Sequence, residues 1–396
     1  MSEASGPLDG LVVVDFTRVL AGPLCTMILA DLGAEVVKIE RPGTGDDTRT
    51  WDPPEVAGDA TYFLGVNRAK KSVVLDLAAP EDAETARRLV ERADVVIENF
   101  RSGVMERLGL GYDDVRAANP GLVYCSIPAF ASSETPKPGY DLLMQALSGL
   151  MSVTGQESPT KVGVALLDVI TGLYASTGVL AALKARDGNG LGQRVTVGLY
   201  EASLAALANQ SAAYLMAGHV PSLAGNAHAS IVPYQAFEAR DRTFVLAAGN
   251  DKLFRDTVEV LDLPELGEDP RFRTNRSRVE HRDLLVKILA EKFMERDARD
   301  WVDRLDSRGV PAALIRSLDE VFDAPESQAA LVDVPDPARG GSLRYVRTPI
   351  TLSGTPLPEP TVPPPHLGEH TAQILAALQR TDPPSARGDR LPEGPA

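Results

Sequence analysis

The stretch "LVVVDFTRVLAGPLCTMILADLGAEVVKIE" (residues 11–40) decides the fold class, because it combines a strand, a helix and a second strand. Residues 11–16 are mostly apolar and rich in valine, as in a buried strand, and residues 34–40 repeat this pattern. The segment 23–33 between them is typical of a helix that ends at Gly33. Apolar strands that alternate with helices favour an α/β sheet.

The next hundred residues continue the alternation. A helix is predicted for 80–93, with Pro80 at its start. Further strands are predicted at 72–77, 94–100 and 122–130. We therefore expect a doubly wound sheet, in which ligands bind beyond the carboxyl ends of the strands. The segments that would lie there are 17–23, 41–49 and 99–103.

A chain of 396 residues is too long for one simple core and suggests about two domains. We expect a large α/β domain over residues 1–216, mostly helical from 139 onward apart from a strand at 193–200. A smaller α+β domain is expected over 217–330, and a C-terminal segment with one last helix over 331–380. The tail 381–396 is rich in proline and charge, so we expect it to be disordered.

Composition excludes several classes of function. The net charge of -15 argues against nucleic acid as a partner. The cysteines, Cys25 and Cys125, lie in apolar surroundings and indicate buried thiols in a reducing compartment. The acidic N-terminus lacks a signal peptide, and no apolar run reaches the roughly 18 residues of a membrane span. We expect a cytoplasmic protein without a membrane partner.

Asp168 is the only charged residue between Lys161 and Lys184. The commonest role for such an aspartate is an N-cap, with its carboxylate accepting a hydrogen bond from a backbone N–H of the helix that follows. A carboxylate at a helix N-terminus stays ionised and, in an apolar pocket, is also a possible covalent nucleophile. The position alone leaves both interpretations open.

Other motifs bound the chemistry. Basic residues near the predicted strand ends are mostly expected to be solvated: Arg18, Arg41, Arg68, Lys70, Lys71, Arg101 and Arg107. Their position favours Arg41, Arg101 and Arg107 as anion-binding residues. All five histidines follow residue 218, so a Ser-His-Asp device confined to the first 218 residues is excluded. The sequence has no Walker loop and no His- or Cys-based metal motif, so we expect neither a metal nor a nucleoside triphosphate.

Several long strings resemble the family III CoA-transferases, which include formyl-CoA and carnitine CoA-transferases. The opening string covers residues 8–49, and "ADVVIENFRSGVMERLGLGYDDV" (93–115) and "DVITGLYASTGVLAAL" (168–183) follow in order. Shorter matches include "PGYDLLMQALSGLMSVTG" (138–155) and "HLGEHT" (366–371). The resemblance covers nearly the whole chain, from about residue 8 to 378.

The resemblance implies that Asp168 is the nucleophile. Its carboxylate would attack the donor acyl-CoA to form a mixed anhydride, and the released CoA thiolate would convert the anhydride into an aspartyl-CoA thioester. A carboxylic acid acceptor would then take the CoA. Apolar surroundings would exclude water, which would otherwise hydrolyse the anhydride.

The resemblance also implies the CoA contacts and the assembly. It implies a Rossmann-like large domain, a small domain, a C-terminus that returns to the large domain, and a homodimer of two interlocked rings. The implied CoA-binding residues are Leu20, Ala21, Arg41, Leu75, Asn99, Phe100, Arg101, Arg107, Gly139, Tyr140 and Asp141. Arginines suit the phosphates of CoA, and an apolar edge suits its adenine.

The sequence departs from the formyl-CoA transferases at two places, and two alternative functions remain open. Formyl-CoA transferases carry glutamine at the position of Leu20 and a glycine run where this chain has "AGNAHAS" (224–230), so oxalate and formate are not expected substrates. The superfamily also contains α-methylacyl-CoA racemases, whose base is a histidine at the position of Tyr140. Tyrosine is a poor general base at neutral pH. The other alternative is a CoA-binding protein without catalysis, which would not need Asp168.

Overall fold

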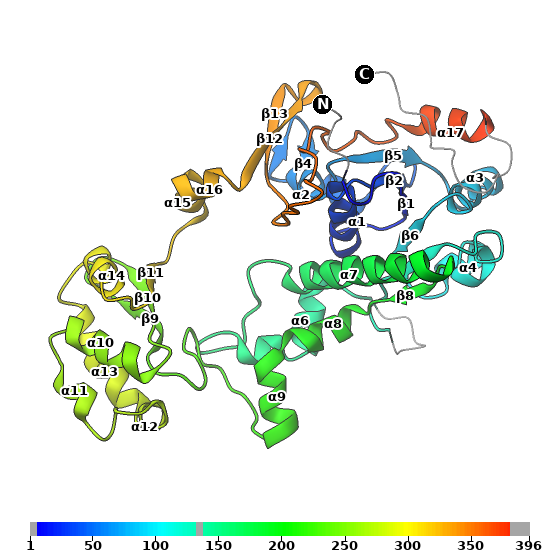
Figure 1. Ribbon diagram of the computed structural model, residues 1–396. Helices are drawn as coiled ribbons and strands as arrows, with labels where there is room; N and C mark the ends of the chain where they lie inside the picture. The colour runs from blue at the N-terminus through cyan, green and yellow to red at the C-terminus, as the bar shows by residue number, and fades with distance from the viewer. Residues whose placement is uncertain (1–5, 132–137, 381–396) are drawn as a thin grey trace. The chain divides into compact units, whose positions relative to one another are not determined.

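The computed structural model describes residues 6–131 and 138–380. The expected tail, 381–396, and most of the loop 131–139 lie outside these residues. The chain divides into two compact units, one made of residues 6–150, 162–218 and 330–380, and the other of 151–161 and 219–329. The first unit therefore receives the chain again after the second is complete, as Figure 1 shows by colour.

The centre of the first unit is a six-stranded parallel sheet (Figure 1). The strands are short, and the central strands β1 and β6 consist mostly of valine and isoleucine because nearly all of their residues are buried. In spatial order the strands are β5 (Lys70–Val74), β2 (Glu35–Glu40), β1 (Val12–Asp15), β6 (Val95–Glu98), β7 (Val123–Ser126) and β8 (Arg194–Thr196). The predicted α/β class with a large parallel sheet is confirmed.

Helices cover both faces of this sheet. Helices α1 (Ala21–Asp31) and α7 (Leu166–Asn189) pack on the face that carries Val13, Val36 and Val95. The opposite face is covered by α3 (Pro80–Val90), α4 (Val104–Arg107) and α17 (Thr371–Arg380). The last helix of the unit thus returns to lie beside α3 (Figure 1).

The remaining elements of the first unit are short. Helices α6 and α8 pack against α7, and α9 follows α8. Residues 331–346 form a hairpin that the sequence did not predict. Their bounds, with the other small elements, are β3 (Glu55–Val56), β4 (Asp59–Ala60), α2 (Thr61–Gly65), α5 (Tyr112–Val115), α6 (Asp141–Leu147), α8 (Leu199–Ala206), α9 (Ala208–Ala217), β12 (Leu331–Asp336) and β13 (Gly341–Val346).

The second unit has its own core around the buried side chains of Trp301, Phe244 and Phe293. Its three-stranded antiparallel sheet has the order β11 (Ala312–Leu314), β10 (Thr243–Ala247), β9 (Tyr234–Glu238). Its helices are α10 (Asp251–Val260), α11 (Glu265–Glu268), α12 (Asn275–Glu280), α13 (Arg282–Phe293), α14 (Ala298–Asp306), α15 (Leu318–Asp323) and α16 (Pro325–Gln328).

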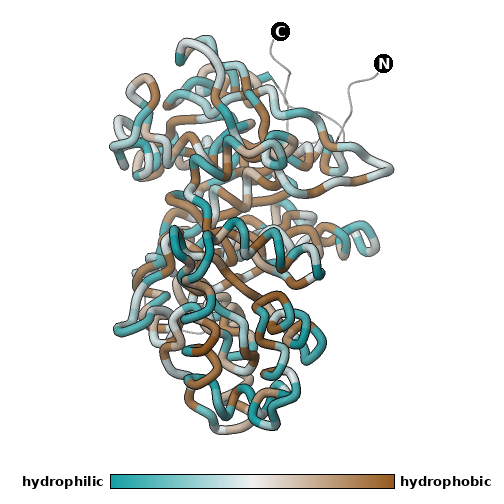
Figure 2. The backbone as a smooth tube through the Cα atoms, turned by 90° about the vertical axis from the view of Figure 1, so that its left-hand side faces the viewer, coloured by the Kyte–Doolittle hydropathy of each residue, from teal (hydrophilic) through white to brown (hydrophobic). Residues whose placement is uncertain are grey.

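Helix α7 corrects one sequence expectation. Its 24 residues are long and apolar enough to cross a membrane by length and composition, although no such run was predicted. Half of the apolar stretch is buried within the protein, against α1, α8 and β7. Core helices of globular proteins meet the same criteria, and hydrophobic stretches are interspersed with hydrophilic ones along the chain (Figure 2).

Candidate active site

Two cavities lie at the carboxyl edge of the parallel sheet, where the sequence placed the ligand. The first, of about 220 Å³, is lined by residues that follow β1, β2 and β5. The second, of about 160 Å³, is lined by residues that follow β1, β6 and β7 and by Asp168. Arg18 and Phe100 line both cavities, so the two are neighbours.

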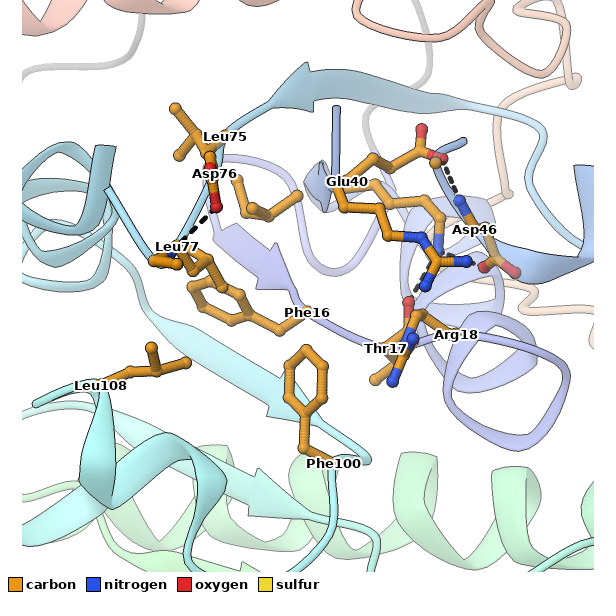
Figure 3. A pocket seen from close by; sticks show the side chains of 15 residues that line it. Phe16, Thr17, Arg18, Glu40, Asp46, Leu75, Asp76, Leu77, Phe100 and Leu108 are labelled. Carbon is orange, nitrogen blue, oxygen red and sulfur yellow. Dashed lines mark hydrogen bonds and ion pairs between the residues drawn. The ribbon is translucent and has the colours of Figure 1, made fainter. Parts of the chain in front are cut away.

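The first cavity has an apolar side and a charged side. Leu75, Leu77 and Leu108 lie on one side in Figure 3, whereas Arg18 and Glu40 lie on the other. An apolar wall suits a flat aromatic group, and arginines suit phosphate groups. This cavity therefore has the composition of a nucleotide-type site.

Asp168 lies at the second cavity as the third residue of α7. The N-cap interpretation is wrong, because Ala165 occupies the cap position and Asp168 is already helical. Its carboxylate is only 9% exposed, and no hydrogen-bond donor among the described residues reaches it. Burial, reinforced by the negative charge of Asp141, raises the pKa of Asp168 to about 7.

The start of α7 is fixed by Asp141, the first residue of α6. One carboxylate oxygen of Asp141 accepts a hydrogen bond from the Leu167 backbone N–H at 2.9 Å, and the other accepts one from Gln145 at 2.6 Å. Asp141 lines neither cavity. Its contacts are those of a residue that positions the helix carrying Asp168.

Helix α1 approaches the same cavity with its N-terminus. Gly172 lies one helical turn after Asp168, where a Cβ atom would come within 2.7 Å of the Ala21 carbonyl oxygen. This close approach requires glycine and brings the face of α7 that carries Asp168 against the first turn of α1. Leu20 and Ala21, from that turn, line the cavity together with Asp168.

The loop before α1 is held in a strained conformation. Val19 has φ of 72°, which is rare for a β-branched residue. The Asn99 side chain clamps Arg18 by accepting from its N–H at 2.9 Å and donating to its carbonyl at 2.7 Å. Asp46 accepts from the Val19 N–H at 3.2 Å. These contacts hold Leu20 and Ala21 at the cavity.

A buried ionic cluster, which we define as Asp15, Lys38, Asp46 and Lys70, lies beneath this loop. The Lys38 ammonium contacts Asp46 at 2.9 Å, and the Lys70 ammonium contacts Asp15 at 3.2 Å, all four side chains being fully buried. Sequence reasoning missed this cluster and expected Lys70 to be solvated. Arg68 is likewise buried, in an ion pair with Asp31. Charged residues inside apolar strands were the signal that could have indicated it.

The structure brings most of the predicted site residues to the two cavities. Arg41 and Leu75 line the first cavity, and Phe100 lines both. Arg107 and Asp141 line neither, and Arg107 is exposed on α4. The second cavity contains Leu20, Ala21, Asn99, Arg101, Gly139, Tyr140 and Asp168. The residues that the sequence did not single out are Asp46 and Asp47. Asp47 contacts the guanidinium groups of Arg18 and Arg41, and Asp46 accepts a hydrogen bond from the Val19 N–H.

Two histidines do fold back to the first unit. Their segment pairs with the edge strand β5, where the Ser72 N–H donates to the His370 ring at 3.3 Å and the His370 N–H donates to the Ser72 carbonyl at 2.9 Å. Neither His366 nor His370 lines a cavity. Within residues 6–131 and 138–380, no group of three or more His, Cys, Asp and Glu side chains could hold a metal ion.

The structure places two neighbouring cavities at the edge of a parallel sheet, with the buried carboxylate of Asp168 at the second. The family model for CoA-transferase family III matches residues 8–371. The chain therefore belongs to CoA-transferase family III. It is an enzyme of that class, and CoA thioesters are co-substrates of such enzymes.

Curated relatives and solved structures agree with this assignment. The chain is 40% identical to a succinate–glutarate CoA-transferase of Agrobacterium fabrum, over 96% of this chain and 97% of that protein. It is 39% identical to the human succinyl-CoA:glutarate CoA-transferase, over 95% and 87%. A CAIB/BAIF family protein from Brucella suis superposes with a TM-score of 0.83 at 40% identity, over 94% of this chain and all of that one. These matches favour CoA transfer over the racemase and the non-catalytic binder.

Proposed function

We propose that this enzyme transfers CoA between dicarboxylic acids, with Asp168 as the covalent nucleophile. The observation that carries the proposal is the Asp168 carboxylate, which is buried without a partner in the cavity next to the nucleotide-type cavity. A carboxylate without hydrogen-bond donors keeps its lone pairs free for attack. The names of the relatives, which pair succinate with glutarate, support dicarboxylic acids as donor and acceptor.

The reaction consists of four substitutions at acyl carbon. The Asp168 carboxylate attacks the donor thioester carbonyl, the C–S bond breaks, and CoA leaves as the thiolate. The thiolate attacks the Asp168 carbonyl of the resulting anhydride, which releases the donor acid and leaves an aspartyl-CoA thioester. The acceptor carboxylate and then the thiolate repeat these two steps in reverse. Asp168 is regenerated and no net bond to water forms.

The surroundings of Asp168 support this chemistry. Each step passes through a tetrahedral oxyanion, and the first N–H groups of α1 have no intrahelical partner, so they can stabilise that charge. The side chains of Leu20, Ile127 and Leu199 line the same cavity and exclude water. Burial keeps Asp168 protonated below about pH 7, so the attacking carboxylate forms as the pH rises through this value.

CoA occupies the first cavity and reaches Asp168 through the second. Leu75, Leu77 and Phe16 offer an apolar wall for the adenine, and Arg41 offers a guanidinium for a phosphate. Arg107, exposed on α4, is available for a second phosphate. Neither a metal nor a nucleoside triphosphate is required, because the exchange of one thioester for another is nearly isoenergetic.

The finer features of the fold and assembly also belong to this proposal. The strand order β5-β2-β1-β6-β7-β8 supports a Rossmann-like large domain. Exposed apolar side chains on α6, α7 and α9 support a homodimer that buries this surface: Leu147, Leu173, Tyr174, Tyr214, Leu215 and Met216. Two buried free thiols support a reducing, cytoplasmic compartment.

A transfer assay tests the proposed function. Purified enzyme receives succinyl-CoA and one acid from a panel of monocarboxylic and dicarboxylic acids, and new acyl-CoA esters are identified by chromatography and mass spectrometry. We expect glutaryl-CoA or another dicarboxylic monothioester to form, and Asp168→Asn to lower its rate by at least about 10³-fold. Transfer to no acid by the wild type, or full activity of Asp168→Asn, would contradict the proposal.

A further inference from the structure

Arg18, in the loop after β1, is the one arginine among the described residues that lines both the first cavity and the cavity of Asp168. The sequence alone indicated only a solvated charge at this position. The backbone of Arg18 is fixed on both sides by Asn99, and its guanidinium lies 5.0 Å from the centre of the Phe100 ring. Because Asn99 fixes the backbone and Phe100 contacts one face of the guanidinium, the remaining N–H donors of the guanidinium point in a fixed direction.

The Arg18 side chain is 35% exposed, and among the described residues only Asp47 accepts a hydrogen bond from its guanidinium. An arginine carries five N–H donors. One Arg18 nitrogen, Nη1, contacts Asp47 at 3.3 Å, and the Nε atom is buried without a hydrogen-bond partner among the described residues. A buried N–H without an acceptor is unfavourable unless a ligand supplies one. The Nε edge of a guanidinium is a surface on which a carboxylate binds with two parallel hydrogen bonds.

The other cations that line the cavities are engaged or exposed. Arg41 donates to Thr44 at 2.6 Å and pairs with Asp47. Lys38 is fully buried, with Asp46 and the Thr17 carbonyl as partners. Arg101 is exposed to solvent, where water satisfies its donors. Arg18 therefore combines a buried unpaired donor with a place in the cavity of Asp168.

We propose that Arg18 binds the distal carboxylate of the dicarboxylic substrate and selects dicarboxylic over monocarboxylic acids. This inference rests on the proposed function, which places the reacting carboxyl group at Asp168. The lining of the second cavity is largely polar, but it includes the apolar side chains of Leu20, Ile127 and Ala129, which suit the methylene chain of such an acid. A monocarboxylic acid would leave the buried Nε of Arg18 unpaired, which disfavours its binding.

The test compares glutarate with pentanoate, which has the same carbon chain but no distal carboxylate. In a double-displacement reaction, kcat/KM for the acceptor reports only the reaction of the CoA-loaded enzyme with that acceptor. We expect Arg18→Met to lower the ratio of kcat/KM for glutarate to that for pentanoate roughly 30-fold or more. Affinity for CoA should fall by less than this factor, because Arg41 and Arg107 remain for the phosphates.

A binding measurement separates failure of this inference from failure of the proposed function. Calorimetry of glutarate with the CoA-bound Asp168→Asn enzyme does not require the nucleophile. We expect binding in that background and at least roughly 10-fold weaker binding when Arg18→Met is added. Binding that is equal with and without Arg18, or no glutarate binding to the CoA-bound Asp168→Asn enzyme, would overturn the assignment even if transfer is observed.

Two further variants complete the design. Arg101→Met removes the other guanidinium at the second cavity, and Arg276→Met removes a highly exposed guanidinium in the second unit. We expect the glutarate-to-pentanoate ratio to stay within about 3-fold of wild type in both. A collapse of the ratio in Arg101→Met but not in Arg18→Met would assign the distal carboxylate to Arg101. A loss of CoA affinity in Arg18→Met with an unchanged ratio would make Arg18 a phosphate ligand.

Discussion

Asp15 and Asp168 are both buried aspartates at the same edge of the sheet, yet their surroundings are opposite. Asp15 contacts the Lys70 ammonium and accepts hydrogen bonds from Thr17 and Thr26. Burial alone would raise its pKa, but Lys70, Lys38 and the two hydroxyl groups outweigh burial and lower the pKa to about 2. Asp168 has no such partners within residues 6–131 and 138–380, and burial together with the charge of Asp141 raises its pKa to about 7.

The opposite pKa shifts of Asp15 and Asp168 indicate a structural role for the first carboxylate and a reactive role for the second. The lone pairs of Asp15 are occupied by donors from β5, α1 and its own loop, so it stabilises the native state in its charged form. The lone pairs of Asp168 are free, so its charged form is unstable in the protein and reactive toward a carbonyl carbon. The ionic cluster holds the loop that lines the cavity, and in the mechanism that we propose Asp168 performs the chemistry there.

The largest effect on stability is expected at Asp15. Replacement by Asn leaves the buried Lys70 ammonium without its counter-ion, which typically costs about 3–5 kcal/mol of unfolding free energy. Urea denaturation followed by circular dichroism measures the change. The matched control is Asp187→Asn, which breaks an exposed ion pair with Lys184 and should change stability by less than about 0.5 kcal/mol.

A second substitution should restore part of the stability lost in Asp15→Asn. If the loss comes from the uncompensated ammonium, Asp15→Asn combined with Lys70→Met should be more stable than Asp15→Asn alone, because the buried charges that remain, Lys38 and Asp46, are paired with each other. A double variant that is less stable than Asp15→Asn would contradict a role for the ion pair. It would instead assign the stability to the hydrogen bonds of Asp15 with Thr17 and Thr26.

An effect of opposite sign on the free energy of unfolding is expected at Asp168. Its folded pKa of about 7 lies above the unfolded value of 3.8, so its protonated form is fully compatible with the fold below about pH 4. Stability is lost as the pH rises from 4 through 7 and the buried carboxylate ionises. Asp168→Asn removes this loss and should stabilise the protein by roughly 4 kcal/mol above pH 8.

The measurement is a thermal melt of wild type and Asp168→Asn at pH 5 and at pH 8.5. The gain in melting temperature of the variant should be small at pH 5 and larger at pH 8.5. A gain that does not depend on pH would show that Asp168 is not the titrating group. A destabilised variant at pH 8.5 would mean that the Asp168 carboxylate has a favourable partner in the folded protein.

The sequence predicted the sheet well, because burial on both faces makes parallel strands almost wholly apolar. The strands β1, β2, β6 and β7 each lie inside a predicted strand, and α3 lies inside the predicted helix 80–93. The hairpin of β12 and β13 was missed, because residues 331–346 contain proline and glycine and lack a long apolar run. The extended conformation of such a segment depends on pairing with its partner strand, so local composition does not predict it.

Part of the site could be predicted from residues that stand out from their neighbours in sequence. The isolation of Asp168 in apolar sequence was visible, but its place in the first turn of α7 was not, because the N-cap falls on Ala165 without a side-chain hydrogen bond. The burial of Lys70 and the shared contacts of Asp47 depend on three separate strand ends meeting in space. Charged residues inside apolar strands indicate that such a cluster can form, but which side chains meet in it is a property of the folded sheet.

The central claim is that Asp168 becomes covalently linked to CoA. Intact-protein mass spectrometry after incubation with succinyl-CoA tests it directly, with wild type and Asp168→Asn measured together. We predict a CoA adduct on wild type that hydroxylamine removes, that maps to the peptide containing Asp168, and that is absent from the variant. An adduct that persists in Asp168→Asn, or that maps to another residue, would contradict the assignment of Asp168 as the nucleophile.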